Sequence, residues 1–273
     1  MLLPHMPVRH GSCGAARRHV TTFSRKPGRR SLANSSATRP ACYRVEGNPL
    51  EELRRLVDAH ARRSQGPVRF RPDTWRPWLE PLGAGHVLET GTACTTGRRG
   101  DRGISRDDVT ALRSGVGDDP DGLRDLFVAV MIWGSGTTNG RGPRHTSAAL
   151  SDARLKDVLR TTRASVRSGD LKSAYARFAL NGVGRSFFTK WFAAVDDRGP
   201  DADRALILDV RVFRSLNALG WSSREAAGVG HWPTRYAVYV STMHGWAREL
   251  GVTAEWLEWL LFDRNGRVHG DER

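Results

Sequence analysis

Apolar residues recur every three or four positions along most of the chain from residue 48 onward, which is the spacing of amphipathic helices. Start signals support several of these helices, because Asn48 precedes Pro49 in the first and Ser105 stands before another. Alternation of apolar and polar residues never holds for more than a few positions. The pattern predicts an all-α protein, with helices over residues 48–63, 105–113, 121–133, 151–167, 168–180, 186–195, 209–219, 233–250 and 253–262.

Two stretches lack this periodicity. Residues 66–102 carry Trp75 and Trp78 among scattered Gly and Pro, and we expect them to be irregular. Residues 134–144 are rich in Gly and Arg and follow a strongly apolar segment that ends at Trp133. We expect a flexible basic loop there.

A glycine-punctuated segment, residues 180–184, separates two of the predicted helices and has the sequence Leu-Asn-Gly-Val-Gly. Glycine adopts turn conformations that other residues resist, and its bare backbone can approach a phosphate closely. The N–H groups at the start of the next helix also form an anion site. We therefore predict a helical hairpin that binds a phosphate through Gly182, Val183, Gly184, Arg185 and Ser186. An ordinary connection between helices is the alternative.

A carboxylate follows the hairpin in the segment Ile-Leu-Asp-Val-Arg, residues 207–211. Asp209 precedes an apolar-periodic stretch, so it is expected to cap that helix. Capping would also hold the carboxylate rigidly, as is required of a group that stabilises a developing positive charge.

These two segments resemble the helix-hairpin-helix DNA glycosylase superfamily, whose hairpin is Leu-Pro-Gly-Val-Gly and whose catalytic aspartate lies in an apolar-Asp-apolar segment. More narrowly, residues 187–190 and 207–209 resemble the bacterial proteins of the 8-oxoguanine DNA glycosylase fold. The resemblance spans roughly residues 121–262. It implies two helical lobes with an active-site cleft between them, double-stranded DNA carrying a modified base as the partner, and Asp209 as a catalytic residue.

The chain departs from the lyase-type members at one position. They carry a lysine two residues after the last hairpin glycine, where this chain has Ser186. Lys190 lies four residues further, on the same helix face and about 6 Å along the axis. It is a candidate catalytic nucleophile that attacks the sugar C1′. Binding a phosphate or extending from an apolar helix face are the alternatives.

Three aromatic residues are candidates for the base pocket. Trp133 could stack on an extruded base, fill the gap left in the duplex, or simply pack in the core. Phe187 lies in the hairpin's second helix beside Lys190, and Trp256 lies in the last predicted helix, which completes the pocket in relatives.

The formal net charge of +14 suits a polyanionic partner, but it is unevenly distributed. The first 45 residues hold nine Arg or Lys and no Asp or Glu, so residues 46–273 carry only +5. We predict a disordered basic tail over residues 1–45 and one helical domain over residues 46–273. An organellar transit peptide and an over-extended start of the reading frame are the alternatives for the tail.

The cysteine positions and the hydropathy bear on cofactors and on the cellular compartment. Cys13, Cys42 and Cys94 lack metal-ligand spacing, and none lies near the C-terminus, which argues against the iron–sulfur cluster of the endonuclease III branch. No metal or other cofactor is expected. The few cysteines suit a reducing compartment, and no run of eighteen apolar residues occurs, so we expect a cytoplasmic monomer without membrane contact.

The preferred hypothesis is a DNA glycosylase that flips out a modified base, with 8-oxoguanine as the default, and cleaves its N-glycosidic bond. Excision of a phage-modified cytosine in anti-phage defence is an alternative within the same chemistry. A non-catalytic hairpin protein that only binds DNA is an alternative from another class. Asp209 distinguishes them, because a binding protein does not need this acid.

Overall fold

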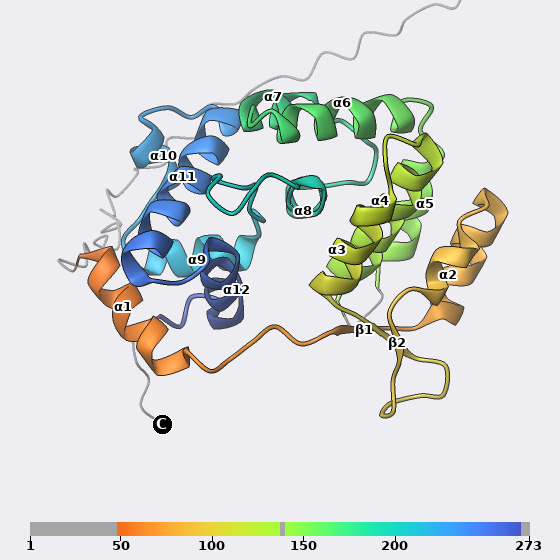
Figure 1. Ribbon diagram of the computed structural model, residues 1–273, viewed down its shortest axis with the longest axis horizontal. Helices are drawn as coiled ribbons and strands as arrows, with labels where there is room; N and C mark the ends of the chain where they lie inside the picture. The colour runs from red at the N-terminus through yellow and green to blue at the C-terminus, as the bar shows by residue number, and fades with distance from the viewer. Residues whose placement is uncertain (1–47, 137–139, 269–273) are drawn as a thin grey trace, which may run out of the picture. The chain divides into compact units, whose positions relative to one another are not determined.

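The computed structural model describes residues 48–136 and 140–268 (Figure 1). The predicted tail of residues 1–45 lies outside the described residues. Over those two ranges the chain forms twelve α-helices and three short strands, which confirms the predicted all-α class. No helix in the described ranges has the length and hydrophobicity needed to cross a bilayer.

The first group of helices surrounds α4 (Pro120–Gly134). All side chains from residue 126 to residue 133 are buried, as expected for a helix that is apolar on every side. Asp119 caps this helix by accepting a hydrogen bond of 2.7 Å from the backbone N–H of Gly122. The helices that contact α4 are α3 (Arg106–Gly115), α5 (Gly142–Leu150), α6 (Leu155–Arg167) and α8 (Arg185–Val195), and α2 (Pro72–Leu79) packs on α5.

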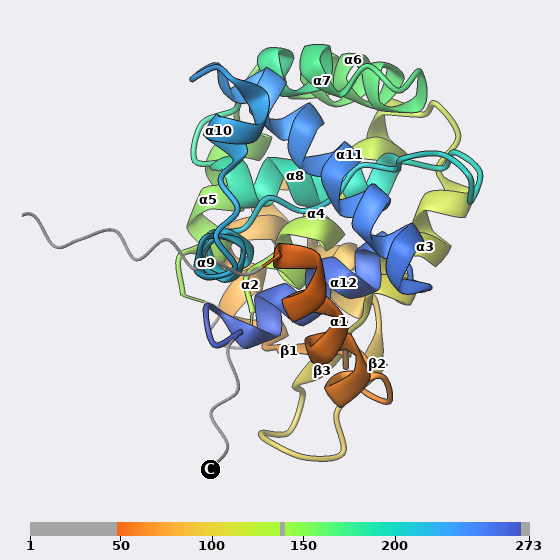
Figure 2. The same cartoon turned by 90° about the vertical axis from the view of Figure 1, so that its left-hand side faces the viewer.

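The second group is built around the longest helix, α11 (Trp232–Leu250), which contacts α1, α10 and α12. Its other members are α1 (Pro49–His60), α9 (Val210–Ala218), α10 (Ser223–Ala227) and α12 (Ala254–Arg264). The short helix α7 (Leu171–Arg177) contacts both α6 and α11, so it joins the two groups (Figures 1 and 2). The two groups match the two helical lobes that the resemblance implies.

The stretch expected to be irregular contains a small antiparallel sheet of order β1-β3-β2, formed by β1 (Val68–Phe70), β2 (Thr92–Ala93) and β3 (Arg102–Ile104). Val68 pairs with Ile104, and Thr92 pairs with Gly103. Helix α2 and two 3₁₀ segments, η1 (Glu80–Leu82) and η2 (Gly85–Glu89), complete the stretch. The expectation of irregular structure was wrong, because strands of two or three residues are too short to show an alternating pattern.

The observed helix boundaries differ most from the predicted ones in the region after α4. The predicted basic loop of residues 134–144 is shorter than expected, because α5 already begins at Gly142. Pro143 occupies the first turn, where proline is favoured, and this start signal outweighs the preceding glycines. The next helix, predicted from residue 151, begins only at Leu155, after Asp152 binds Arg154. Residues 137–139 lie outside the described part of the chain.

Candidate active site

A turn between α7 and α8 forms the predicted hairpin. Gly182 has φ +77°, a conformation that favours glycine, and Val183 is buried and donates its N–H to the carbonyl of Leu180. A Cβ at position 182 would lie 3.0 Å from Nδ1 of His145, so space as well as backbone conformation requires glycine there. Gly184 has an ordinary φ. A Cβ at this position would have no neighbour within 4 Å, so there is space beside Gly184 for a side chain.

The two hairpin glycines should therefore differ in their tolerance of substitution. We expect Gly182→Ala to lower the free energy of unfolding by roughly 1–2 kcal/mol, the cost of the left-handed conformation for a residue with a Cβ. Gly184→Ala should leave it almost unchanged, because its φ of −78° suits alanine. Urea unfolding of both variants beside the wild type measures this difference. Equal losses would contradict the assigned roles.

The amino end of α8 provides free backbone donors. Gly184 is the N-cap residue of α8, and no side chain caps this end of the helix. The next residues, Arg185 and Ser186, begin the helix and are partly exposed. Uncapped N–H groups at a helix start form an anion site.

Lys190 is buried one helical turn after Ser186. Its Nζ donates a hydrogen bond of 3.1 Å to the carbonyl of Ser186 and lies 3.7 Å from Oδ2 of Asp209. Burial lowers the pKa of Lys190, although the carboxylates of Asp209 and Glu258 oppose this shift. Removal of solvent thus favours the neutral amine, which is the nucleophilic form of lysine.

Asp209 is the N-cap of α9, which confirms the capping prediction. Its Oδ1 accepts a hydrogen bond of 2.9 Å from the backbone N–H of Arg211, and its Oδ2 faces Lys190. One oxygen therefore holds the carboxylate on the helix end, while the other is presented to the lysine. The side chain is 14% exposed, so it is neither sealed in the core nor fully solvated.

The segment before Asp209, residues 205–208, is neither helix nor strand and is fully buried. Its backbone has no sheet partner, so buried side chains satisfy it instead. The backbone N–H groups of Ala205 and Ile207 donate to Asp196 and Glu258, each at 2.7 Å. The carbonyls of 206 and 207 accept from the hydroxyls of two buried tyrosines on α11, Tyr236 and Tyr239, at 2.8 and 2.9 Å.

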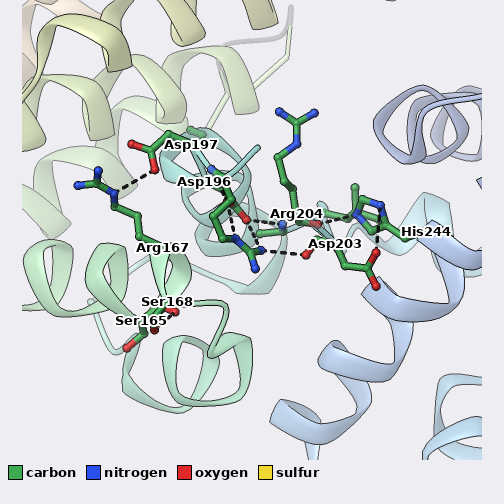
Figure 3. Close-up of polar contacts among 12 residues, drawn as sticks. Ser165, Arg167, Ser168, Asp196, Asp197, Asp203, Arg204 and His244 are labelled. Carbon is green, nitrogen blue, oxygen red and sulfur yellow. Dashed lines mark hydrogen bonds and ion pairs between the residues drawn. The ribbon is translucent and has the colours of Figure 1, made fainter. Parts of the chain in front are cut away.

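Side chains also hold the residues that lead into segment 205–208. His244 on α11 contacts the carbonyl of Arg204 through Nε2 at 2.9 Å and lies 3.8 Å from Asp203 through Nδ1 (Figure 3). Asp196 forms an ion pair of 2.7 Å with Arg198 while it binds the segment. Polar side chains from several elements thus set the path that leads to Asp209.

Thr189 connects the hairpin helix directly to this segment. Its buried hydroxyl donates to the carbonyl of Arg185 at 2.8 Å and accepts from the N–H of Leu208 at 2.9 Å. Leu208 immediately precedes Asp209, so this bond fixes the position of the carboxylate relative to α8 and Lys190.

Removal of the Thr189 hydroxyl should destabilise the fold. We expect Thr189→Val, which keeps the shape of the side chain, to lower the free energy of unfolding by roughly 1–3 kcal/mol, because the N–H of Leu208 would remain buried without an acceptor. Thr189→Ser keeps the acceptor and should recover most of the loss. Urea unfolding of both variants tests this, and equal stability of the Val and Ser variants would contradict it.

A cavity of about 560 Å³ lies between the two helical groups and is lined by both Lys190 and Asp209. This volume is within the range of small-molecule sites. The first group contributes Arg106 and the end of α4, and the second contributes α12 and the start of α9. The lining residues are Gln65, Pro67, Val68, Arg106, Trp133, Gly134, Ser135, Gly136, Lys190, Ile207, Asp209, Val210, Arg211, Glu258, Trp259 and Phe262.

Three of these residues supply polar groups away from the lysine and aspartate. Glu258 is buried and lies 3.5 Å from Arg106, and burial raises the pKa of its carboxyl despite the nearby guanidinium. Arg106 lies over the ring of Trp133 at 5.4 Å. The buried Nε1 of Trp133 has no hydrogen-bond partner among the described residues. The cavity wall thus carries donors and an acceptor that a polar ligand could bind.

The structure distinguishes among the aromatic candidates. Trp133 lines the cavity. Phe187 does not line it, but its ring lies 5.5 Å from Nζ of Lys190 and so covers the lysine. Trp256 also lies outside the cavity lining, and its Nε1 donates to the carbonyl of Arg63 at 2.9 Å. Trp259, which also belongs to α12, lines the cavity instead.

Comparison with known protein families bears on this site. The family model described as "Putative 8-oxoguanine DNA glycosylase OGG-like protein" matches residues 61–262. The chain belongs to this family. The matched region of the OGG-like family contains the hairpin and all the cavity residues. Searches of curated proteins and of solved structures found no significant match. Membership of the OGG-like family supports a DNA glycosylase, with DNA as its substrate.

Sequence reasoning missed three residues of this OGG-like site: Arg106, Thr189 and Glu258. A signal for Glu258 was available, since it is a lone charge within the apolar stretch of residues 256–262. A charge in such a place is buried only when it has partners. Thr189 and Arg106 carry no comparable signal, because their roles depend on segments distant in sequence.

Proposed function

We propose that the protein extrudes a modified base from duplex DNA into the 560 Å³ cavity and cleaves its N-glycosidic bond with Asp209 and Lys190. The observation that carries this proposal is the approach of Nζ of Lys190 to Oδ2 of Asp209, at 3.7 Å, on the wall of a cavity beside the hairpin. The hairpin glycines and the amino end of α8 would hold the DNA backbone.

Asp209 would act on the sugar. As the bond between C1′ and the base nitrogen breaks, its electron pair leaves with the base and positive charge develops on the sugar. A fixed carboxylate stabilises that charge without reorganisation, and the capping bond to Arg211 keeps it fixed. In the hydrolytic route, water adds to C1′ and releases a proton, and the base gains one, which gives a free base and an abasic site.

Lys190 allows a covalent route in the same cavity. Its neutral amine would attack C1′ while the base leaves with the bonding electron pair. One amine proton passes to the departing base and the other to the ring oxygen O4′ as the bond between C1′ and O4′ breaks, which gives a Schiff base between Nζ and C1′. Burial of Lys190 supports this route, because a lowered pKa increases the fraction of neutral amine.

For the base itself, we propose 8-oxoguanine as the first substrate to test, following the description of the family. The cavity offers the donors of Arg106 and Trp133 and the carboxyl of Glu258 to the edge of a base. A purine with both carbonyl and N–H groups on its edge could bind all three of these side chains.

Mass spectrometry of bases released from defined duplexes tests the proposal. Duplexes would carry 8-oxoguanine opposite each normal base, a hydroxymethylated cytosine, or no modification. We expect free 8-oxoguanine from the first set alone. Release of the modified cytosine instead would support a defence enzyme, and binding to all duplexes without any release would support a non-catalytic DNA-binding protein.

A further inference from the structure

Two arginines enclose the ring of Trp232 at the start of α11. The Cζ atom of Arg185 lies 3.8 Å from the ring centroid, and the Cζ atom of Arg235 lies 3.5 Å from it. Two guanidinium groups so close to one centroid would collide on a single face, so they occupy opposite faces of the indole. Stacking of this kind orients the planar cations.

Further contacts hold this arrangement. Arg235 donates two hydrogen bonds, of 3.2 and 2.9 Å, to the hydroxyl of Ser223 in α10. The exposed Arg224 is the next residue of α10, and its charge acts on Arg235 together with that of Arg185. Burial and these like charges lower the pKa of Arg235. Positive charges from α8, α10 and α11 are therefore close enough to act on one another.

No carboxylate offsets these charges within the described ranges, since none of the three guanidinium groups forms an ion pair there. Arg248, at the other end of α11, shows the contrast, because it pairs with Asp203 at 2.7 Å. Like charges repel one another, so a cluster without ion pairs, in which two of the three arginines are held by stacking, is suited to bind an external anion.

The place of the cluster indicates which anion this is. Arg185 is the first residue of α8, directly after the hairpin glycine Gly184. It precedes Lys190 by five residues, which is roughly 7.5 Å along the helix axis. Arg185 and Lys190 are thus little more than one helical turn apart on α8, and a phosphate bound at Arg185 would lie near a sugar at Lys190.

We propose that Arg185, Arg224 and Arg235 form an arginine clamp for a phosphodiester of duplex DNA beside the extruded nucleotide. The proposal rests on the proposed function for its DNA partner. The clamp adds side-chain contacts from α10 and α11 to the backbone contacts of the hairpin. It therefore fixes the second helical group, which carries Asp209, on the same strand.

Affinity for a duplex with a stable abasic analogue, measured by fluorescence anisotropy over a series of potassium chloride concentrations, tests the clamp. We expect Arg224→Gln and Arg235→Gln each to weaken binding about threefold to tenfold and to reduce the slope of log K against log salt by about one. Arg248→Gln removes the same charge from α11 outside the clamp and should change neither quantity. Arg224 is exposed and makes no bond to Ser223, so its replacement should not disturb folding.

The outcomes separate the clamp from the proposed function. If the wild type releases base and all three variants bind the duplex as tightly as the wild type, the clamp is wrong and the proposed function stands. If the slopes change as expected but no duplex loses a base, the clamp stands and the glycosylase mechanism is wrong. Equal weakening by Arg248→Gln would show a general effect of charge and would also overturn the clamp.

Discussion

Asp209→Asn is expected to lower the rate of base release by a factor on the order of a thousand, because the side chain keeps its shape but loses the charge that stabilises the cationic sugar. Asparagine is as good an N-cap as aspartate, so α9 should keep its start and the protein its stability. Affinity for DNA should change little, since Asp209 contacts Arg211 and Lys190 and not the hairpin turn. Single-turnover base release, with protein in excess of DNA, measures the effect.

Asp170→Asn is the matched control. Asp170 caps α7 by accepting a hydrogen bond of 3.0 Å from the N–H of Ser173, and it lies outside the cavity lining. Its replacement removes one negative charge at another helix start, so its rate should stay close to that of the wild type. Wild-type rates in both variants would show that the carboxylate of Asp209 has no part in the reaction.

Lys190→Gln is expected to abolish the covalent complex that borohydride reduction traps between the protein and its DNA substrate. Reduction requires a Schiff base, and glutamine has no amine to form one. Lys172→Gln removes an exposed lysine from α7, the helix that precedes the hairpin, and should leave trapping unchanged. A trapped complex that persists in Lys190→Gln would place the nucleophile elsewhere.

The same complex should depend on pH with a definite sign. Burial lowers the pKa of Lys190, so the neutral amine becomes abundant at a lower pH than for a solvated lysine, whose pKa is about 10.4. Trapping should increase as the pH rises through the lowered pKa of Lys190. It should reach its plateau at a lower pH than it would with a solvated lysine. Base release without trapping at any pH would show that water, and not Lys190, attacks the sugar.

The hairpin and the long helices could be predicted from the sequence because their signals are local. Glycine conformation and helix capping act within a few residues, so the turn at Gly182 and the cap at Asp209 follow from neighbours alone. The proximity of Lys190 to Ser186 follows from helix geometry in the same way. That Lys190 and Asp209 line the same cavity could not be predicted, because it depends on the packing of distant helices.

The remaining features depend on tertiary contacts. The three strands and α10 are too short to give a periodic pattern, and α2 has only eight residues. The network around residues 205–208 uses Thr189, Tyr239 and Glu258, which are far apart in sequence and meet only in the fold. Buried polar groups of this kind cannot be inferred until the backbone that they satisfy is known to lie inside.

A crystal structure of Asp209→Asn bound to a duplex that carries a modified base would test the central claim most directly. The account predicts that the modified nucleotide lies extruded in the cavity, with its C1′ next to residue 209 and Nζ of Lys190 and its flanking phosphates on the hairpin. A nucleotide stacked within the duplex, or bound away from Lys190 and residue 209, would contradict the account.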